Sequence, residues 1–194
     1  MAELVVEITN AGAFGRSRVE RFLEIQYDRA FGGKIRGHYP SLISVSDSEG
    51  NLCAAAGFRR ADAGPLFLEQ YLDEPVDVLI GAGFGGPVAR RDIAEIGNLA
   101  SVTPVASWAL FEALARHLEN AGCRFAVATA TRQLRRTFAR ARMDIQTLSR
   151  ATAERLTEGR EDWGGYYQRD PEVLAGPINA QADKLAAVYR RAAV

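Results

Sequence analysis

The sequence predicts an α/β fold of three layers, in which helices flank both faces of a mixed sheet. The chain has 194 residues, of which 47% are hydrophobic, so it can bury one substantial core. An early hairpin signal predicts antiparallel strands, and a later strand, helix, strand order predicts a right-handed crossover between parallel strands. One sheet with both kinds of pairing belongs to the α/β class. We expect residues 1–194 to form a single domain, with residues 151–194 as a C-terminal extension packed on it.

The first predicted elements are a helix and a hairpin. Ser17 and Glu20 have the spacing of a capping box, and apolar residues then recur every third or fourth position until a pair of glycines ends the pattern after residue 31. Two apolar runs, at residues 42–46 and 52–60, flank the turn-forming sequence DSEGN. This pattern predicts two strands joined in a hairpin.

The middle of the chain is less regular. Residues 65–72 are predicted to be helix rather than strand, and Asp73 with Pro75 offers another helix start directly after them. Residues 81–87 are rich in glycine and predict a loop. These glycines lack the following lysine of a phosphate-binding loop, so they predict no nucleotide site.

The second half of the chain alternates strands and helices. Thr103 is placed to cap a helix with Pro104 at its first position, and Gly122 ends this helix after a continuous apolar face. The other elements follow from periodicity and from β-branched content. They are strands at residues 92–100, 123–131 and 144–149, and helices at residues 133–142 and 179–191.

Composition and cysteine usage argue against several classes of protein. The 24 basic and 24 acidic residues cancel, which argues against nonspecific binding to nucleic acid or to an anionic membrane surface. Cys53 and Cys123 lie in apolar segments without metal-ligand spacing, as is typical of free thiols in a reducing compartment. The sequence has no signal-peptide pattern and no run of about 18 apolar residues. We therefore expect a cytoplasmic protein with no metal site, no nucleic-acid partner and no integral membrane segment.

One predicted strand carries the most informative polar residues. Strict alternation would place Glu95 and Asn98 on opposite faces of the sheet, but Gly97 between them is typical of a bulge that unites them. In a partly desolvated cleft the pKa of Glu95 would rise, and the carboxylate would suit a general base that acts directly or through one water. Backbone N–H groups freed by the bulge would suit an oxyanion. The alternative is a structural ion pair of Glu95 with Arg59 or Arg91.

Two further clusters each have a functional and a structural interpretation. Arg132, Arg136 and Arg140 repeat every fourth position of a helix, so they share a face that can meet phosphates or an acidic carrier protein. The alternative is a solvated helix face. The aromatic run at residues 163–167 can stack on a ligand, and alternatively it packs a late segment on the core. His38 and His117 are isolated in the sequence, so a histidine-based catalytic triad has little support.

Four blocks of residues, in order along the chain, resemble the signature blocks of the thermostable hemolysin family. The blocks are residues 66–73, 95–101 and 129–131, and Trp163-Gly164 with Tyr166-Tyr167. The resemblance extends from about residue 18 to residue 178. Because the family name records a membrane-lysing phenotype, the resemblance implies a membrane-active, hemolysin-type protein as one hypothesis.

The same layout is similar to the acyl-homoserine-lactone synthases and, more distantly, to the GCN5-related N-acetyltransferase fold. Glu95 matches the strand glutamate of the lactone synthases, whereas Asn98 stands where they carry an arginine. Residues 36–40 stand where they carry an acidic cluster, and both departures argue against S-adenosylmethionine as the acceptor. Residues 101–107 replace the glycine-rich pyrophosphate loop of the acetyltransferases, so donor phosphates would depend on a helix start and on nearby arginines.

The resemblance implies an acyltransferase-like domain that moves an acyl group from an acyl-CoA or acyl-carrier-protein thioester to a small, unidentified amine. It implies no bound cofactor, because acyl-CoA or acyl-phosphopantetheine would be a co-substrate. Glu95 would be the base and Asn98 would orient the substrate. The donor would contact Ser101, Val102, Thr103, Arg132 and Arg136. The substrate would also contact Arg59, Glu69, Tyr71, Thr129, Trp163 and Tyr166. A noncatalytic module that binds acyl thioesters is the remaining hypothesis.

Overall fold

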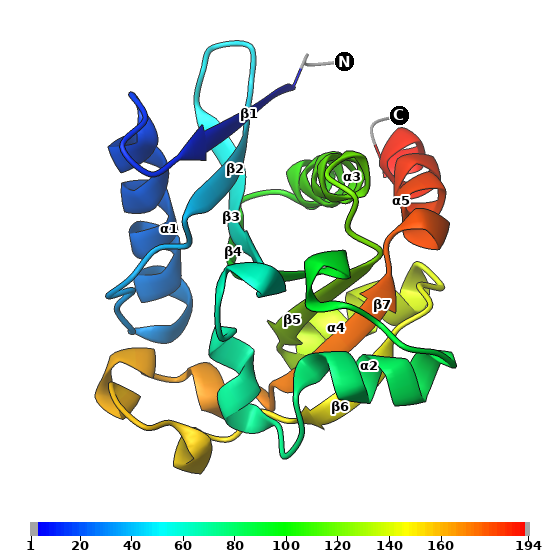
Figure 1. Cartoon of the computed structure of the whole chain (residues 1–194). Helices are drawn as coiled ribbons and strands as arrows, with labels where there is room; N and C mark the ends of the chain where they lie inside the picture. The colour runs from blue at the N-terminus through cyan, green and yellow to red at the C-terminus, as the bar shows by residue number, and fades with distance from the viewer. Residues whose placement is uncertain (1–3, 193–194) are drawn as a thin grey trace.

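The computed structural model describes residues 4–192, and these residues confirm the three-layer α/β fold. Seven strands of this part of the chain form one sheet in the order β1-β2-β3-β4-β5-β7-β6 (Figure 1). β4 and β5 are parallel, and the other neighbouring strands are antiparallel. The strands are β1 (Val5–Asn10), β2 (Ser41–Ser46), β3 (Leu52–Arg60), β4 (Ile93–Ser101), β5 (Phe125–Ala130), β6 (Gln146–Arg150) and β7 (Glu172–Pro177). The helices are α1 (Arg16–Phe31), α2 (Val76–Phe84), α3 (Pro104–Asn120), α4 (Arg132–Arg140) and α5 (Asn179–Ala192).

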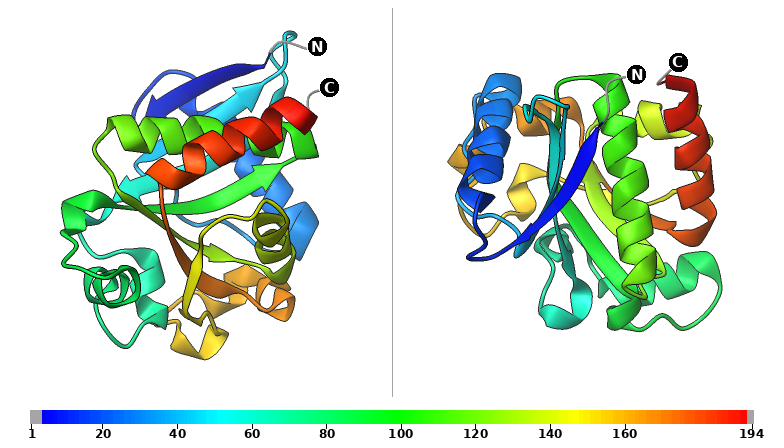
Figure 2. Two further views of the ribbon diagram at one scale, coloured as in Figure 1. Left: turned by 90° about the vertical axis from the view of Figure 1, so that its right-hand side faces the viewer. Right: turned by 90° about the horizontal axis from the view of Figure 1, so that it is seen from above.

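Helices cover both faces of the sheet (Figure 2). α1 lies on one face, where Val19 and Leu23 pack with Leu42 of β2 and Ala55 of β3. α3 and α5 lie side by side on the other face, and Leu110 of α3 is among the buried residues there. The burial of these apolar stripes is the main favourable contribution to folding.

Most predicted elements are confirmed, and several of their ends follow the capping signals in the sequence. The predicted capping box of Ser17 and Glu20 is wrong, because α1 begins at Arg16 after Gly15, no side chain caps it, and Glu20 pairs with Arg16 instead. The Thr103 hydroxyl accepts a hydrogen bond from the Ala106 backbone N–H at 3.1 Å, and Pro104 occupies the first turn of α3. A threonine caps α4 in the same way. The helical preference predicted for residues 65–72 is met by a short 3₁₀ helix, η2, at Phe67–Tyr71.

Two strands of the sheet escaped prediction. β1 is an edge strand whose large apolar residues, Val5, Val6 and Ile8, are exposed, so its sequence has no burial pattern. β7 lies between β5 and β6 with consecutive buried residues, and such a strand lacks the alternation that marks a half-buried one. Residues 151–194, expected to pack on the domain as an extension, contribute β7 to the interior of the sheet and α5 to one of its faces.

The predicted loop at residues 81–87 is wrong for its first part, because α2 continues through four of these residues and ends at Gly85. A glycine inside the helix allows close packing rather than a turn, since a Cβ atom on Gly83 would collide with Oε1 of Gln146. The chain reverses only at Gly85, whose φ of +81° is readily accessible to glycine.

The sheet opens between β4 and β5 at one end. The two strands pair only over residues 93–96 and 125–128, although β4 continues to pair with β3 as far as Ser101. Ala55 and Gly57 of β3 are two residues apart, whereas their partners in β4, Ala100 and Gly97, are three residues apart. The additional residue of β4 lies beside Asn98, whose φ is +48°. This extra residue is the predicted bulge, and a bulge bends the strand that contains it. The separation of β4 from β5 is the feature that positions the site.

Candidate functional site

A cavity of about 1370 Å³ lies where β4 and β5 separate, and residues from both faces of the sheet line it. On the α3 face the wall is apolar and includes Phe111, Leu114, Leu134, Phe138, Met143 and Leu185. On the α1 face the wall is aromatic and polar and includes Tyr27, Phe31, Tyr39, Arg59, Trp163 and Tyr166. We call these two parts the apolar lobe and the polar lobe.

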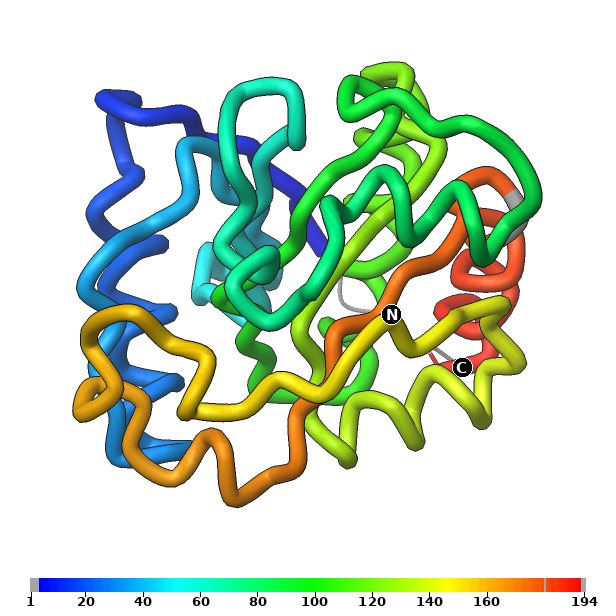
Figure 3. Tube along the Cα trace, turned by 60° about the horizontal axis from the view of Figure 1, so that its bottom comes forward, coloured from blue at the N-terminus to red at the C-terminus, as the bar shows by residue number. Residues whose placement is uncertain are grey.

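The polar lobe is closed by a segment far from α1 in the sequence. Residues 151–170 lie beside the C-terminal end of α1 (Figure 3), where the Gly165 N–H donates a hydrogen bond to the Phe31 carbonyl oxygen at 2.7 Å. The Trp163 and Tyr166 rings of this segment lie 5.2 Å apart between centroids and both line the cavity. The aromatic cluster therefore packs on the core, as one interpretation predicted, and it also lines the cavity, where stacking on a ligand stays a prediction.

Glu95 lies behind the wall of the polar lobe and is only 1% exposed. Its Oε2 accepts hydrogen bonds from Arg59 Nε at 2.8 Å and from the Phe67 N–H at 3.1 Å, and its Oε1 accepts one from the Leu68 N–H at 2.8 Å. The structural ion pair with Arg59 is therefore present, whereas Arg91 pairs elsewhere. These donors compensate the burial of the charged carboxylate.

Tyr39, which the sequence analysis missed, covers Glu95 on the cavity side. Its ring lies over Gly57 of β3 and Gly97 of β4, which are directly opposite each other in the sheet. A Cβ atom on Gly57 would lie 2.7 Å from the ring, and one on Gly97 would collide with the hydroxyl oxygen. The Arg59 guanidinium carbon lies 5.7 Å from the ring centroid. We call the space over Gly57 and Gly97 that the ring occupies the Tyr39 slot. These two glycines are its signal in the sequence, but the signal is recognisable only when their pairing across the two strands is known.

The Tyr39 hydroxyl is directed to the Glu95 carboxylate. Burial raises the pKa of this hydroxyl well above its usual value, and the hydrogen-bonded Glu95 carboxylate raises it further. Arg16 fixes the backbone of the same segment, because its Nη2 donates to the Tyr39 carbonyl oxygen at 2.5 Å and its Nη1 donates to that of Pro40 at 2.9 Å. The hydroxyl is therefore protonated at neutral pH. Glu95 holds the hydroxyl end of the side chain, and Arg16 holds the backbone end of the residue.

The bulge brings Asn98 to the face of the sheet that carries Glu95, as predicted. Asn98 lines the cavity, and its Nδ2 donates a hydrogen bond to the carbonyl oxygen of Gly37 at 3.3 Å. Gly37 lies two residues before Tyr39, so the amide and the phenol lie on the same side of the sheet. Asn98 accepts a left-handed backbone conformation more readily than most residues do.

The predicted site residues divide between the cavity wall and its surroundings. Those in the wall are Arg59, Asn98, Ser101, Thr129, Trp163 and Tyr166. Those outside the wall are Glu69, Tyr71, Val102, Thr103, Arg132 and Arg136, and Glu95 lies directly behind it.

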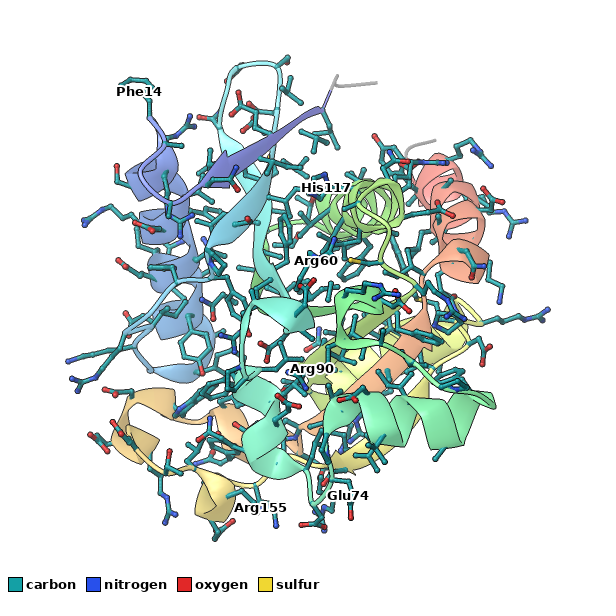
Figure 4. The ribbon with its side chains drawn as sticks, viewed as in Figure 1. Phe14, Arg60, Glu74, Arg90, His117 and Arg155 are labelled. Atoms are coloured by element: carbon teal, nitrogen blue, oxygen red, sulfur yellow. The ribbon has the colours of Figure 1, made fainter. Side chains whose placement is uncertain are left out.

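Glu69 and Tyr71 hold neighbouring loops together. Glu69 accepts hydrogen bonds at 2.7 and 3.0 Å from Arg90, which lies among the segments that connect β3 to β4 (Figure 4). Although burial opposes the shift, these bonds and two from backbone amides lower the pKa of Glu69 to about 2. Tyr71 is buried, and its hydroxyl oxygen lies 2.6 Å from that of Tyr167. Their contacts are therefore structural.

The basic residues of α4 form two groups. Arg132 and Arg135 pair with Asp170 at 3.2 and 2.9 Å, which neutralises part of the predicted basic face. Arg136 and Arg140 are exposed and pair with no residue within the described part of the chain. Any anion that meets this face would therefore meet these two guanidinium groups first.

Residues 4–192 contain no group of three or more His, Cys, Asp and Glu side chains arranged to hold a metal ion. Cys53 and Cys123 are both free thiols. The helices of this part are too short or too polar to cross a membrane.

Solved structures match this chain over most of its length at low sequence identity, whereas no curated protein sequence matches it. BjaI, a CoA-dependent acyl-homoserine lactone synthase with SAM and isopentyl-CoA, gives a TM-score of 0.64 at 13% identity, covering 96% of this chain and 90% of BjaI. The AHL synthase LasI gives 0.61 at 13% identity and 92% coverage of both chains. FeeM, an N-acyl amino acid synthase from uncultured soil microbes, gives the same values. These likenesses show the fold, which is that of the acyl-homoserine lactone synthases and of the N-acetyltransferase type.

The sequence itself identifies the family. The profile of the family described as thermostable hemolysin matches residues 9–182, which include every block on which the resemblance was based. The chain therefore belongs to the thermostable hemolysin family.

Proposed function

We propose that this protein transfers an acyl group from an acyl-CoA or acyl-carrier-protein thioester to a small amine. The observation that carries the proposal is the gap between β4 and β5, where residues 97–100 have no strand partner on the β5 side. Unpaired strand edges offer N–H and C=O groups to an extended ligand that contains amides, such as a phosphopantetheine arm. The same gap joins the apolar lobe to the polar lobe.

The donor would lie in the gap with its acyl chain in the apolar lobe. The side chains there offer carbon surface to a hydrocarbon chain, and each buried CH₂ group is worth about 0.8 kcal/mol. Ser101 lies in the wall at the end of β4, directly before the start of α3, and helix starts favour phosphate groups. Arg136 and Arg140 supply exposed positive charge for a phosphate or for an acidic carrier protein.

The acceptor would lie in the polar lobe, where the two terminal nitrogens of the Arg59 guanidinium group are available to a ligand. Its Nε is bound to Glu95, whereas Nη1 and Nη2 have no partner among the described residues, and the side chain lines the cavity. A guanidinium group with two available N–H donors suits bidentate binding of a carboxylate. We therefore favour an acceptor amine that also carries a carboxylate group. FeeM is named as an N-acyl amino acid synthase, which agrees with an acceptor of this class.

In this reaction the amine nitrogen attacks the thioester carbonyl, a C–N bond forms, the C–S bond breaks and a thiol leaves. Asn98 would orient the substrate from the bulge, and Glu95 would be the base that finally takes the proton. Because Glu95 lies behind the cavity wall, the proton must reach it through an intervening group.

Thiol release tests this function. We expect thiol release from acyl-CoA or acyl-carrier thioesters when the protein meets its amine in a mixed panel, and a loss of about 100-fold or more in Glu95→Gln. Glu112→Gln is the matched control, because Glu112 pairs with Arg116 on the surface of α3, outside the cavity wall. No thiol release across the panel, or equal rates in wild type and Glu95→Gln, would contradict the proposal.

The complete pairing of Glu95 favours one second candidate, a module that binds acyl thioesters without turnover. A carboxylate has about four acceptor sites, and Arg59, Tyr39 and two backbone amides supply four donors. A purely structural Glu95 would predict thermal stabilisation by acyl thioesters together with no thiol release. A thermal melt run beside the thiol assay separates the two candidates.

A further inference from the structure

Tyr39 occupies a slot that the fold builds specifically for its ring. Gly57 and Gly97 form the floor of the slot, and a side chain at either position would displace the ring. Arg59 covers the ring from another side, and Arg16 holds the backbone carbonyl oxygen of Tyr39. The hydroxyl is thereby fixed between the cavity and a buried carboxylate.

Few groups in contact with Glu95 can carry a proton to it. The donors to Glu95 are the Arg59 guanidinium, the Phe67 and Leu68 backbone N–H groups and the Tyr39 hydroxyl. A guanidinium group and a peptide N–H do not give up a proton under ordinary conditions. Among these contacts, the phenol is the group that can exchange one, and Tyr39 also lines the cavity.

We propose that Tyr39 is a catalytic residue of this site, whose hydroxyl takes the proton from the acceptor nitrogen and relays its own proton to Glu95. This inference rests on the proposed acyl transfer and goes beyond it by naming the group that connects the amine to the buried base. The Tyr39 oxygen accepts a hydrogen bond from the amine while its own hydrogen points to the carboxylate. The carboxylate polarises the O–H bond and makes the oxygen a better acceptor.

The atoms and charges balance through the cycle. The lone pair of the neutral amine forms the C–N bond, and the C–S bond breaks as the tetrahedral intermediate collapses. The nitrogen loses one proton to Oη of Tyr39 while the phenol proton moves to the Glu95 carboxylate. The departing thiolate takes one proton back along the same route, so that an amide and a thiol form and both residues return to their starting states.

Removal of the single hydroxyl tests the relay. Tyr39→Phe keeps the ring in its slot and removes one donor to the buried Glu95, so we expect a folded protein with a modestly lower melting temperature, a KM within about threefold and a kcat lower by about 100-fold. Tyr189→Phe makes the same chemical change on α5, outside the cavity wall, and should keep the wild-type rate. A Tyr39→Phe rate within about threefold of wild type would overturn the relay while leaving the acyl transfer in place. A wild-type protein that releases no thiol with any donor and amine would overturn both proposals.

A second measurement separates proton transfer from a structural role. Fluorinated tyrosines at position 39 lower the phenol pKa in steps and keep nearly the same shape. The titratable and charged groups that face this phenol are Glu95, Arg59 and Tyr166, and they stay unchanged in the series. A relay predicts that kcat changes steadily with the phenol pKa, whereas a hydroxyl that only caps Glu95 predicts the same kcat throughout.

Discussion

Glu95 and Glu69 are two glutamates with guanidinium partners, and their surroundings give them different roles. A buried carboxylate is tolerated only when charged or polar donors replace its water. Glu95 receives Arg59 and two backbone amides, and its arginine faces the cavity. Glu69 receives Arg90, which does not line the cavity and also donates to the backbone carbonyl oxygens of Ala61 and Gly64. The position of the arginine, in or outside the cavity wall, therefore distinguishes the candidate site from the structural pair.

Glu95→Gln should also reduce stability. The glutamine amide would place an NH₂ group against donors that now meet carboxylate oxygens, and a buried donor without a partner costs about 1 to 3 kcal/mol. Urea unfolding should show a loss in the free energy of unfolding of about that size. Glu112→Gln should change it by no more than about 1 kcal/mol, as for a surface ion pair. Equal stabilities of Glu95→Gln and wild type would show that the buried contacts do not act as described.

Glu69→Gln should flatten the acid side of the stability curve. Glu69 has a pKa of about 2 in the folded protein, against an unperturbed value of 4.5. Its contribution is present above pH 4.5 and is lost as the pH falls from there through 2, because the unfolded state takes up the proton first. The difference in free energy of unfolding between wild type and Glu69→Gln should therefore shrink over that range. A difference that does not vary with pH would contradict the assigned pairing with Arg90.

At the scale of the structural element, the bulge in β4 and the opening between β4 and β5 belong together. The extra residue at Asn98 bends β4 while its pairing with β3 continues, so the sheet stays intact on one side and opens on the other. A left-handed residue in a strand interior is strained unless it is glycine or asparagine. The bulge in β4 therefore depends on the residue at position 98.

A pair of substitutions tests that dependence. Asn98→Gly keeps the left-handed conformation and should leave the free energy of unfolding within about 0.5 kcal/mol of wild type. Asn98→Val should lower it by about 1 to 2 kcal/mol, because a β-branched residue resists a φ of +48°. Equal losses in the two variants, measured by urea unfolding, would assign the effect to the lost amide and not to the backbone.

Residues close together in the sequence predicted the helices and strands. The geometry of the candidate site depends on contacts between residues that are far apart in the sequence. Thr103 and Pro104 predicted the start of α3 because capping depends on neighbouring residues. Gly97 predicted the bulge for the same reason. Tyr39 could not be predicted, because its slot needs the pairing of Gly97 with a glycine forty residues earlier in the chain. The basic face of α4 was overestimated, since part of its charge is balanced by Asp170.

At the scale of the whole molecule, the cavity crosses the sheet between its two helical layers. Its apolar lobe lies among α3, α4 and α5, and its polar lobe lies between α1 and the aromatic segment. Figure 2 shows these layers on opposite sides of the sheet. In the proposed reaction, the hydrocarbon chain of the donor would lie in the apolar lobe and the acceptor would lie in the polar lobe.

The apolar lobe should set the preferred acyl length. Leu134→Trp would fill part of the lobe, so kcat/KM should fall at least tenfold for long-chain donors and change little for acetyl donors, at about 0.8 kcal/mol per displaced CH₂ group. Val78→Trp on the exposed side of α2 is the control and should affect neither class. Equal effects of Leu134→Trp on short and long donors would place the acyl chain elsewhere.

The most direct test of the account follows the acyl group itself. The protein is incubated with an acyl thioester whose acyl group carries a heavy-isotope label and with a mixture of α-amino acids and their decarboxylated amines, and the products are read by mass spectrometry. We expect a labelled N-acyl amino acid in wild type, in molar balance with the released thiol, and at least about 100-fold less in Tyr39→Phe and Glu95→Gln. Complete recovery of the labelled thioester, or thiol release with only free labelled acid as the product, would contradict acyl transfer to an amine.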